Sequence, residues 1–320
     1  MERKSDLIDV VFCLTDPKGN YIQHTATAML SILENTKAEV QIHVIHDDTL
    51  TLTGKSRLEE ISQRRDQPEL PGKICYHQLD REYFEKVAET AFGKEKKVSV
   101  GTLYRLKIDE ILPVCSKVIY LDSDVIVNMD LSALWGINVD NYFCAAVRDV
   151  SSTRNKWKNR SAFRKMNIET AGYFNAGVLL LNLDVIRHKM SLWNSAMYFF
   201  EKYGRNSLFF DQDALNSLLQ KKTKFLSDDY NFIPVAINTN NLCEEKKAII
   251  HYAGPKPWSY RCSSYDWLYW KYFSMTPWGD TPEKLLDAQK KVGIDLGYAL
   301  QTGKVASRKN LVKGVFSIFS

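Results

Sequence analysis

Two carboxylates one residue apart, Asp122 and Asp124, are the side chains of this sequence best suited to hold a metal ion. Apolar strand-forming residues precede them at 117–121 and follow them at 125–127, which places the acids where a buried strand ends. In an extended backbone, residues i and i+2 point the same way, so the two carboxylates converge while Ser123 faces the opposite side. Converging carboxylates repel unless a cation lies between them, and magnesium or manganese with nucleotide phosphates suits such oxygen ligands.

The acid pair has a second interpretation as a polar turn, because Asp and Ser are ordinary turn residues. The apolar residues directly after it favour a metal site, since buried acids are unfavourable unless paired or metal-bound. His251 lies at the end of the strand expected over 248–252, where a histidine is more often structural than a ligand. Ligands of α/β sheets bind beyond the carboxyl ends of strands, however, so the sequence predicts a three-ligand site of Asp122, Asp124 and His251.

Alternating strand and helix patterns precede the acid pair. Strands are expected at residues 9–14, 41–46 and 74–77, with helices over 21–33 and 53–63 between them. This order is typical of a parallel sheet covered by helices. Neither a G-x-G-x-x-G segment nor a Walker loop occurs, so no standard glycine-rich loop is expected to hold a nucleotide.

The region between the third strand and the acid pair is expected to contain a loop over 81–98 and a helix over 100–112. Ser99 is the expected N-cap of that helix, and Pro113 closes it. Arg105 lies on the helix, and its spacing alone favours a solvated charge.

Polar residues interrupt apolar patterns in the second half of the chain. The run 173–182 contains Asn175, Ala176 and Gly177, which predict close approach of another group to the backbone. After a helix over 185–203, Asp211 is expected near the N-cap of an acid-rich helix, whereas capping does not explain Gln212.

A basic and aromatic segment at 154–164 is expected to form a loop. Its composition suits a lid over an anionic ligand as well as an ordinary solvated loop, and the sequence leaves both interpretations open.

Composition indicates a globular chain. Its 320 residues, 45% hydrophobic and 25% charged, suffice for one large domain with additions. Four cations of the net charge of +5 lie in the last twenty residues, which argues against nucleic-acid binding by the fold. The six scattered cysteines are expected to be buried thiols. Because no apolar run reaches the length of a membrane span and the first residues lack a signal-peptide core, a cytoplasmic location is expected.

Six motifs occur in the order shown by family 8 glycosyltransferases, which include bacterial lipopolysaccharide galactosyl- and glucosyltransferases and, more distantly, glycogenin. The resemblance covers about residues 8–260. It rests on Thr15-Asp16 with Asn20-Tyr21, Tyr104-Arg105, Tyr120 to Asp124, Phe174 to Gly177, Asp211 to Asp213, and His251 to Trp258. One departure is the first loop, which is longer than in the bacterial members because residues 17–19 separate Asp16 from Asn20.

The resemblance implies an α/β GT-A fold: a mostly parallel, Rossmann-like central sheet flanked by helices, with a C-terminal helical and aromatic extension. It also implies a retaining hexosyltransferase that uses manganese, with magnesium as the alternative. The donor would be UDP-glucose or UDP-galactose, and the acceptor a hydroxyl of a glycan, glycolipid or glycoprotein. By the same resemblance, the metal is held by Asp122, Asp124 and His251, and Ser123 lies at the nucleotide sugar. Uracil and ribose are surrounded by Thr15, Asp16 and Tyr21, and the diphosphate is contacted by Gly254 and Lys256. The donor sugar is surrounded by Arg105 and Asp211, and the reaction centre is lined by Asn175, Ala176 and Gln212.

The expected catalytic residues are Gln212, Asp211 and Asn175. Gln212 is a poor nucleophile, which favours front-side attack by the acceptor hydroxyl, and Asp211 is the candidate if a covalent intermediate forms. The metal and Lys256 would stabilise departing UDP. Two other classes stay open: a nucleotide-sugar-binding protein without turnover, and a nucleotidyltransferase that would release pyrophosphate.

We expect three parts: a catalytic domain over 8–260, a C-terminal extension over 261–302 and a basic amphipathic tail over 303–320. The tail interleaves apolar residues with four cations, which suits peripheral contact with the inner face of the plasma membrane. The alternative is that the tail packs on the body or mediates oligomer contacts, and Gly314 weakens the case for a helix there.

Overall fold

A seven-stranded sheet forms the centre of the computed structural model, which describes residues 7–63, 73–96, 98–149, 156–234, 245–259 and 263–279. Its order is β3-β2-β1-β4-β7-β6-β8. All neighbouring strands pair in parallel except β7, which is antiparallel to both β4 and β6. The expected mostly parallel α/β sheet is therefore confirmed. The strands are β1 (Ile8–Leu14), β2 (Val40–His46), β3 (Lys73–Gln78), β4 (Lys117–Leu121), β6 (Cys144–Arg148), β7 (Phe174–Asn182) and β8 (Thr223–Phe225).

A small second sheet places the chain after Asp122 and Asp124 beside His251. Its strands, β5 (Val125–Val127) and β9 (Ile249–His251), are antiparallel, and Val125 pairs with His251. The backbone N–H of Tyr252 also donates to the carbonyl of Asp124, at 3.0 Å. This pairing brings together two segments that lie more than a hundred residues apart in the sequence.

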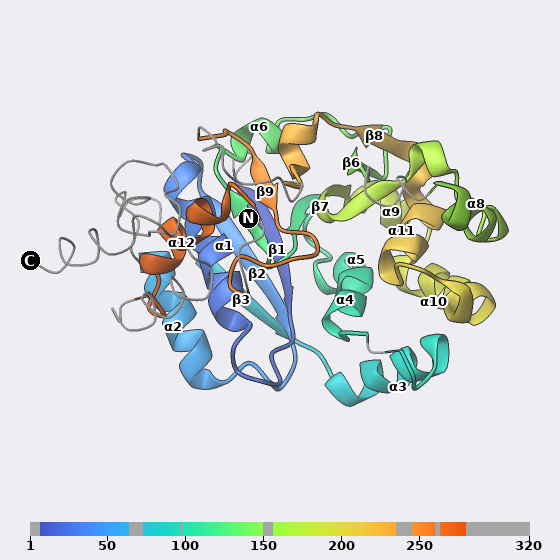
Figure 1. Cartoon of the computed structure of the whole chain (residues 1–320), viewed down its shortest axis with the longest axis horizontal. Coiled ribbons are helices and arrows are strands. Elements are labelled where there is room, and N and C mark those ends of the chain that lie inside the picture. Colours follow the sequence, from blue (N-terminus) through green and yellow to red (C-terminus); the bar gives the residue numbers. More distant parts are fainter. Residues whose placement is uncertain are drawn as a thin grey trace, which may run out of the picture.

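Helices cover both faces of the central sheet (Figure 1). One core joins the sheet to α1 (Ile22–Asn35), α2 (Leu52–Gln63) and α12 (Asp266–Ser274), and the other joins it to α3 (Arg81–Phe92), α9 (Leu183–Lys189), α10 (Leu192–Tyr203) and α11 (Asp211–Leu219). Successive strand residues divide between the cores: Val10 and Phe12 face the first, and Val11 the second. Shorter helices are α4 (Gly101–Tyr104), α5 (Ile108–Ile111), α6 (Ser132–Trp135) and α8 (Lys156–Lys165), with 3₁₀ turns at Arg105–Lys107, Thr170–Gly172, Gly204–Asn206, Gln220–Lys222 and Asp228–Asn231.

The segment after β3 is a helix and not the expected loop. The Asp80 side chain caps α3 by accepting from the backbone N–H groups of Glu82 and Tyr83. Gly93, at φ +91°, ends the helix in a conformation that glycine tolerates best. The high charge of this segment hid a short apolar stripe that includes Phe84 and Phe92.

Two long helices predicted from the sequence are each interrupted. The stretch 100–112 becomes α4, a 3₁₀ turn and α5, and its N-cap is Val100, without a side-chain bond, not Ser99. The stretch 185–203 divides into α9 and α10, because Met190 is extended and the Ser191 side chain caps the second helix.

Several expectations for the second half of the chain are settled only in part. Residues 156–165 form helix α8, so the loop expected at 154–164 is wrong there, and residues 154 and 155 lie outside the described residues. Helix α12 belongs to the expected extension and packs on α1, whereas the tail 303–320 lies outside the described residues. The four cysteines that the structure describes are free thiols. Across the described residues, no helix combines the length and apolar character needed to cross a membrane.

Candidate active site

The acid pair lies in a tight turn between β4 and β5. The carboxylates of Asp122 and Asp124 and a ring nitrogen of His251 lie within 4.8 Å of one another. His251 Nε2 is 3.4 Å from Asp124 and 3.8 Å from Asp122. The convergence predicted from the sequence is present, but the extended backbone is not, because the chain turns between two sheets at Ser123. The Ser123 hydroxyl points elsewhere and accepts from Thr25 at 2.9 Å.

A chain of hydrogen bonds fixes the tautomer of His251. The backbone N–H of Gly177 can only donate, and it donates to Asn175 Oδ1 at 3.0 Å. The same oxygen accepts from Asn231 Nδ2 at 2.8 Å, so Asn231 Oδ1 is free to accept from His251 Nδ1 at 2.9 Å. Nε2 is therefore the ring nitrogen that faces the two carboxylates, where a metal ligand is required.

Gly177 leaves room for this ring. A Cβ at that position would lie 2.2 Å from His251 Cε1 and 2.9 Å from Asp122 Oδ2. Two carboxylates and one imidazole form a donor set that suits manganese or magnesium. The residues present therefore fit the divalent ion expected from the sequence.

Asp124 remains ionised in this site. Burial would raise the pKa of its carboxyl, but His251 and Lys256 outweigh burial and hold the pKa well below its usual range. The Lys256 ammonium forms an ion pair with Asp124 and donates to the Tyr252 carbonyl at 2.8 Å. Gly254, at φ +103°, shapes the loop that carries Lys256 to this position.

Arg105 is buried, so the solvated charge favoured by its spacing is wrong. Its guanidinium donates to Asp122 at 2.8 Å and to the carbonyl of Ala176 at 3.0 Å, and it lies 4.5 Å above the Tyr120 ring. Tyr120 also donates to Asp122, at 2.6 Å. Helical spacing cannot reveal this burial, because the acceptors come from the turn after β4 and from β7.

Asp211 lies next to the N-cap of its helix, as expected, and forms an ion pair there. It is the first residue of α11, the N-cap is Phe210, and Asp211 Oδ2 lies 3.2 Å from Arg105 Nε. Burial raises the pKa of Asp211 to about 6, although Arg105 opposes the shift. One guanidinium thus links two carboxylates on different elements.

Gln212 uses both ends of its amide. Its Oε1 accepts from the backbone N–H of Ala176 at 2.9 Å, and its Nε2 donates to Asp149 at 3.0 Å and to Tyr173 Oη at 3.1 Å. Sequence reasoning did not single out Asp149, although its place directly after β6 is a signal of the same kind as the acids after β4.

A cavity of about 420 Å³ joins the first loop to the acid pair. Thr15, Asp16 and Tyr21 line it together with Arg105, Asp122, Ser123 and Asp124. The side chains of Thr15 and Asp16 also hold the loop in place. Thr15 donates to Asp47 at 2.5 Å, and the Asp16 carboxylate accepts from the backbone N–H groups of residues 20–22, each at 2.9 Å.

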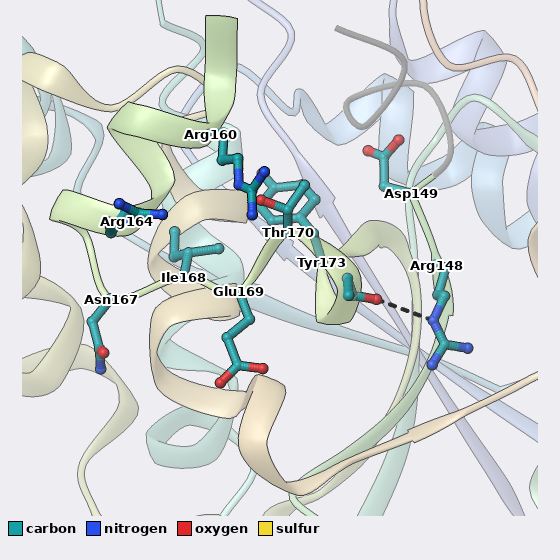
Figure 2. A pocket seen from close by; sticks show the side chains of 10 residues that line it. Arg148, Asp149, Arg160, Arg164, Asn167, Ile168, Glu169, Thr170 and Tyr173 are labelled. Atoms are coloured by element: carbon teal, nitrogen blue, oxygen red, sulfur yellow. Dashed lines mark hydrogen bonds between the residues drawn. The ribbon is translucent and has the colours of Figure 1, made fainter. Parts of the chain in front are cut away.

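A second cavity, of about 660 Å³, is lined by Asp149 and Tyr173, the two partners of Gln212 Nε2, and by arginines of β6 and α8 (Figure 2). Among the described residues, none lines both cavities. The predicted site residues Thr15, Asp16, Tyr21, Arg105, Asp122 and Asp124 thus line the first cavity, and the partners of Gln212 Nε2 line the second.

Comparison with known proteins settles the family. Residues 10–262 match the sequence profile of "Glycosyl transferase family 8". The chain belongs to this family. Relatives include a putative glycosyltransferase of Haemophilus influenzae, 28% identical over 76% of this chain and 71% of the relative, and general stress protein A of Bacillus subtilis, 27% identical over 86% and 96%. The lipopolysaccharide 1,2-glucosyltransferase of Escherichia coli is 28% identical over 55% of this chain and 60% of that protein.

Solved structures confirm the GT-A fold of this family 8 glycosyltransferase. The galactosyltransferase LgtC, solved with donor and acceptor sugar analogues, superposes with a TM-score of 0.70 at 24% identity, over 88% of this chain and 100% of LgtC. The bifunctional glycosyltransferase WbbM gives a TM-score of 0.69 at 20% identity, over 90% of this chain and 52% of WbbM.

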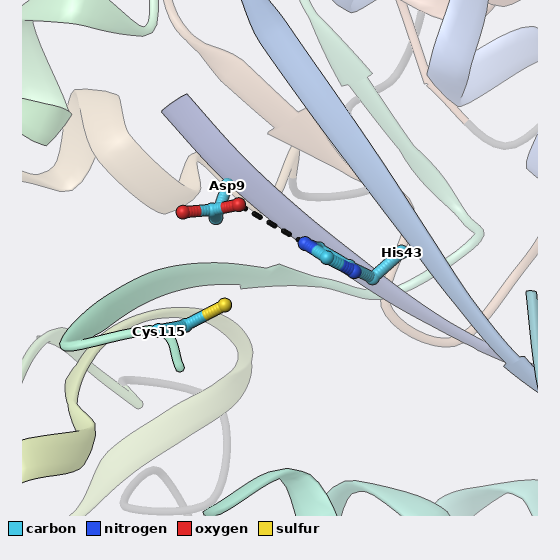
Figure 3. Close-up of side chains that lie close together, drawn as sticks. All are labelled: Asp9, His43 and Cys115. Atoms are coloured by element: carbon cyan, nitrogen blue, oxygen red, sulfur yellow. Dashed lines mark hydrogen bonds and ion pairs between the residues drawn. The ribbon is translucent and has the colours of Figure 1, made fainter. Parts of the chain in front are cut away.

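A further buried cluster of this glycosyltransferase, Asp9, His43 and Cys115, lies near the start of β1, away from the acid pair (Figure 3). His43 Nε2 is 3.0 Å from Asp9, and its Nδ1 is 3.1 Å from His77. Both ring nitrogens of His43 are therefore engaged in hydrogen bonds between adjacent strands. We interpret the cluster as a structural contact of the sheet.

Proposed function

We propose that this glycosyltransferase is a retaining hexosyltransferase, which moves glucose or galactose from a UDP-sugar to a hydroxyl of a glycan acceptor with the help of a divalent metal. The observation that carries the proposal is the convergence of Asp122, Asp124 and His251 beside the cavity of the first loop. Relatives named as lipopolysaccharide 1,2-glucosyltransferase and lipopolysaccharide 1,3-galactosyltransferase support a hexose donor.

The donor's diphosphate would lie over the acid pair. Asp122, Asp124 and His251 would hold manganese, or magnesium as the alternative, and that ion would neutralise charge on the departing UDP. Lys256, an ammonium already at Asp124, would add a second positive charge to the leaving group. Thr15, Asp16 and Tyr21 would border the uridine, because they line the cavity that ends at the acids.

The sugar would lie between the acid pair and Gln212. Arg105 and Asp211 form an ion pair whose polar groups can bond sugar hydroxyls, and Asn175 and Ala176 lie on strand β7. Gln212 carries no charge, and its amide is held at both ends, so it suits electrostatic support of a front-side attack better than nucleophilic attack. Asp211 is the alternative nucleophile, but its bond to Arg105 lowers its reactivity.

The role of Gln212 predicts a specific kinetic signature. Gln212→Ala should lower kcat by about 100-fold, the range for loss of one transition-state donor, and change UDP affinity by less than about threefold. Steady-state transfer and UDP titration measure the two effects. Gln63→Ala, an exposed change on α2, is the matched control. Equal losses in rate and in UDP affinity would remove Gln212 from the reaction centre.

The acid pair offers the direct test of the proposed function. The full chain should release UDP from UDP-glucose or UDP-galactose in the presence of manganese, and Asp122→Asn should abolish both this release and metal-dependent UDP binding while leaving the circular dichroism spectrum unchanged. Asp228→Asn, at an exposed acid, should behave like the parent. Release of pyrophosphate would indicate a nucleotidyltransferase, and UDP-sugar binding without any release would indicate a binding protein.

A further inference from the structure

The cavity of about 660 Å³ beside Asp149 and Tyr173 is lined by three arginines. Arg148 comes from the end of β6, and Arg160 and Arg164 come from α8 on the other side of the cavity (Figure 2). All three side chains belong to exposed residues. The arginines of this cavity thus come from two elements, β6 and α8.

The three arginines differ from Arg81, Arg105 and Arg187, which are each paired with an acid. Among the described residues, none of the three cavity arginines forms an ion pair. Arg148 donates from Nε to the carbonyl of Ala171 at 3.2 Å and lies 3.8 Å over the Phe225 ring. These contacts hold the guanidinium in place without neutralising its charge, and a guanidinium fixed in this way can bind a carboxylate or phosphate through two hydrogen bonds.

The opposite wall of the cavity leads to the proposed reaction centre. Asp149 and Tyr173 line the cavity, and both accept from Gln212 Nε2, at 3.0 and 3.1 Å. The other end of the Gln212 side chain bonds to Ala176, whose carbonyl accepts from Arg105 in the donor cavity. A sugar in the arginine-lined cavity would therefore lie against Asp149 and Tyr173, the two partners of Gln212 Nε2.

We propose that this cavity is the acceptor subsite and that its arginines bind a negatively charged group, a phosphate or a carboxylate, on the acceptor sugar. The proposal rests on the transferase activity proposed above, since only a transferase has an acceptor. Glu169, which also lines the cavity, carries the same charge as such a group. It forms no ion pair with the three arginines among the described residues, so their charge is left for a ligand.

The test compares three matched glycosides that differ only at C6. Methyl β-glucopyranoside, its 6-phosphate and methyl β-glucuronide are titrated calorimetrically into the full chain with manganese and UDP. Binding of at least one anionic glycoside should be tighter than that of the neutral one by about tenfold or more, because a guanidinium forms charge-assisted bonds only with an anion. Preference for the phosphate ester or for the uronide alone would support the proposal and identify the anion.

Variants connect the preference to the cavity. Arg148→Gln and Arg160→Gln should each reduce it, and the double variant should reduce it to less than about threefold. Arg205→Gln, at an arginine that lines a different hollow beside α3, should keep the parental preference. Equal affinity for the neutral and both anionic glycosides, or a preference that survives in the double variant, would overturn the proposal.

Hydrolysis of the UDP-sugar separates this proposal from the proposed function. The arginine variants should keep the parental rate of manganese-dependent UDP release to water, since none of their residues lines the donor cavity. A parent that binds the anionic glycoside in this way but releases no UDP would contradict the transferase and leave the anion site standing. A parent that releases UDP but shows no preference for the anionic glycosides would support the transferase and overturn the anion site.

Discussion

At the scale of single residues, the position of the His251 ring depends on neighbours outside the acid pair. Gly177, Asn175 and Asn231 form a relay in which each hydrogen-bond direction is fixed by the previous one, starting from a backbone N–H that can only donate. Removing the last member leaves the ring free to rotate or to change tautomer. Groups that orient a metal ligand typically contribute 10–100-fold to metal affinity.

Asn231→Ala is therefore expected to weaken manganese binding by about 10–100-fold without unfolding the chain. The signal of free manganese in electron paramagnetic resonance measures this directly, without turnover. Asn138→Ala, at an exposed residue before β6, serves as the control. Unchanged manganese affinity in Asn231→Ala would show that the relay does not position His251.

Asp211 predicts how stability changes with pH. Its pKa is raised to about 6 from an ordinary 3.8, mainly by burial, so the folded chain holds the proton more tightly than the unfolded chain does. The stability that this proton contributes is complete below about pH 4 and is lost as the pH rises to about 6, an effect of roughly 3 kcal/mol. Asp211→Asn cannot titrate and should not lose this contribution.

Urea unfolding of the parent and of Asp211→Asn at pH 4, 5, 6 and 7, without metal or UDP, measures the difference. The unfolding free energy of the variant relative to that of the parent should increase between pH 4 and 6 and stay constant above. Asp124 titrates in the opposite direction, since its pKa is lowered, but it is present in both proteins and cancels in the comparison. Parallel curves for the two proteins would contradict the raised pKa.

At the scale of elements, the sequence predicted what local patterns determine. Strands β1, β2, β4 and β7 are rich in apolar residues because both of their faces are buried, and each was placed correctly to within two residues. Helix α3 was missed because its charged residues outnumber the few apolar ones that face the core. The interruption of 100–112 is a tertiary effect, since Arg105 bonds to groups of β7 and of the turn after β4.

The candidate site shows the same division. The sequence alone identified Asp122, Asp124 and His251, because acids and a histidine at strand ends are visible in a linear pattern. The partners of Arg105, and the parts played by Asp149 and Asn231, depend on contacts between elements far apart in the chain. Pattern reasoning cannot determine such contacts, because hydrogen bonds between distant elements leave no periodic signal.

At the scale of the whole molecule, the proposed acceptor cavity is bordered by β6 and α8, which supply its arginines. Helix α12 packs against α1 in the core on the face of the sheet opposite that of α8 (Figure 1). The chain that follows α12 includes the basic tail 303–320, whose composition suits an anionic membrane surface. A membrane-bound tail would leave both cavities accessible if it bound the membrane from the α12 side.

Lys304, Arg308, Lys309 and Lys313 should each contribute about 1 kcal/mol at an anionic surface, so the attachment should be weak and sensitive to salt. The full chain is expected to sediment with phosphatidylserine-containing liposomes at low ionic strength and to be released as the salt concentration rises, because screening shortens the range of surface charge. A chain ending at Thr302 should lose sedimentation but keep manganese-dependent UDP release. A full chain with the four cations replaced by Gln separates charge from apolar insertion, since it should remain in the supernatant if the cations provide the attachment. Sedimentation that persists in the shortened chain would place the membrane contact elsewhere on the molecule.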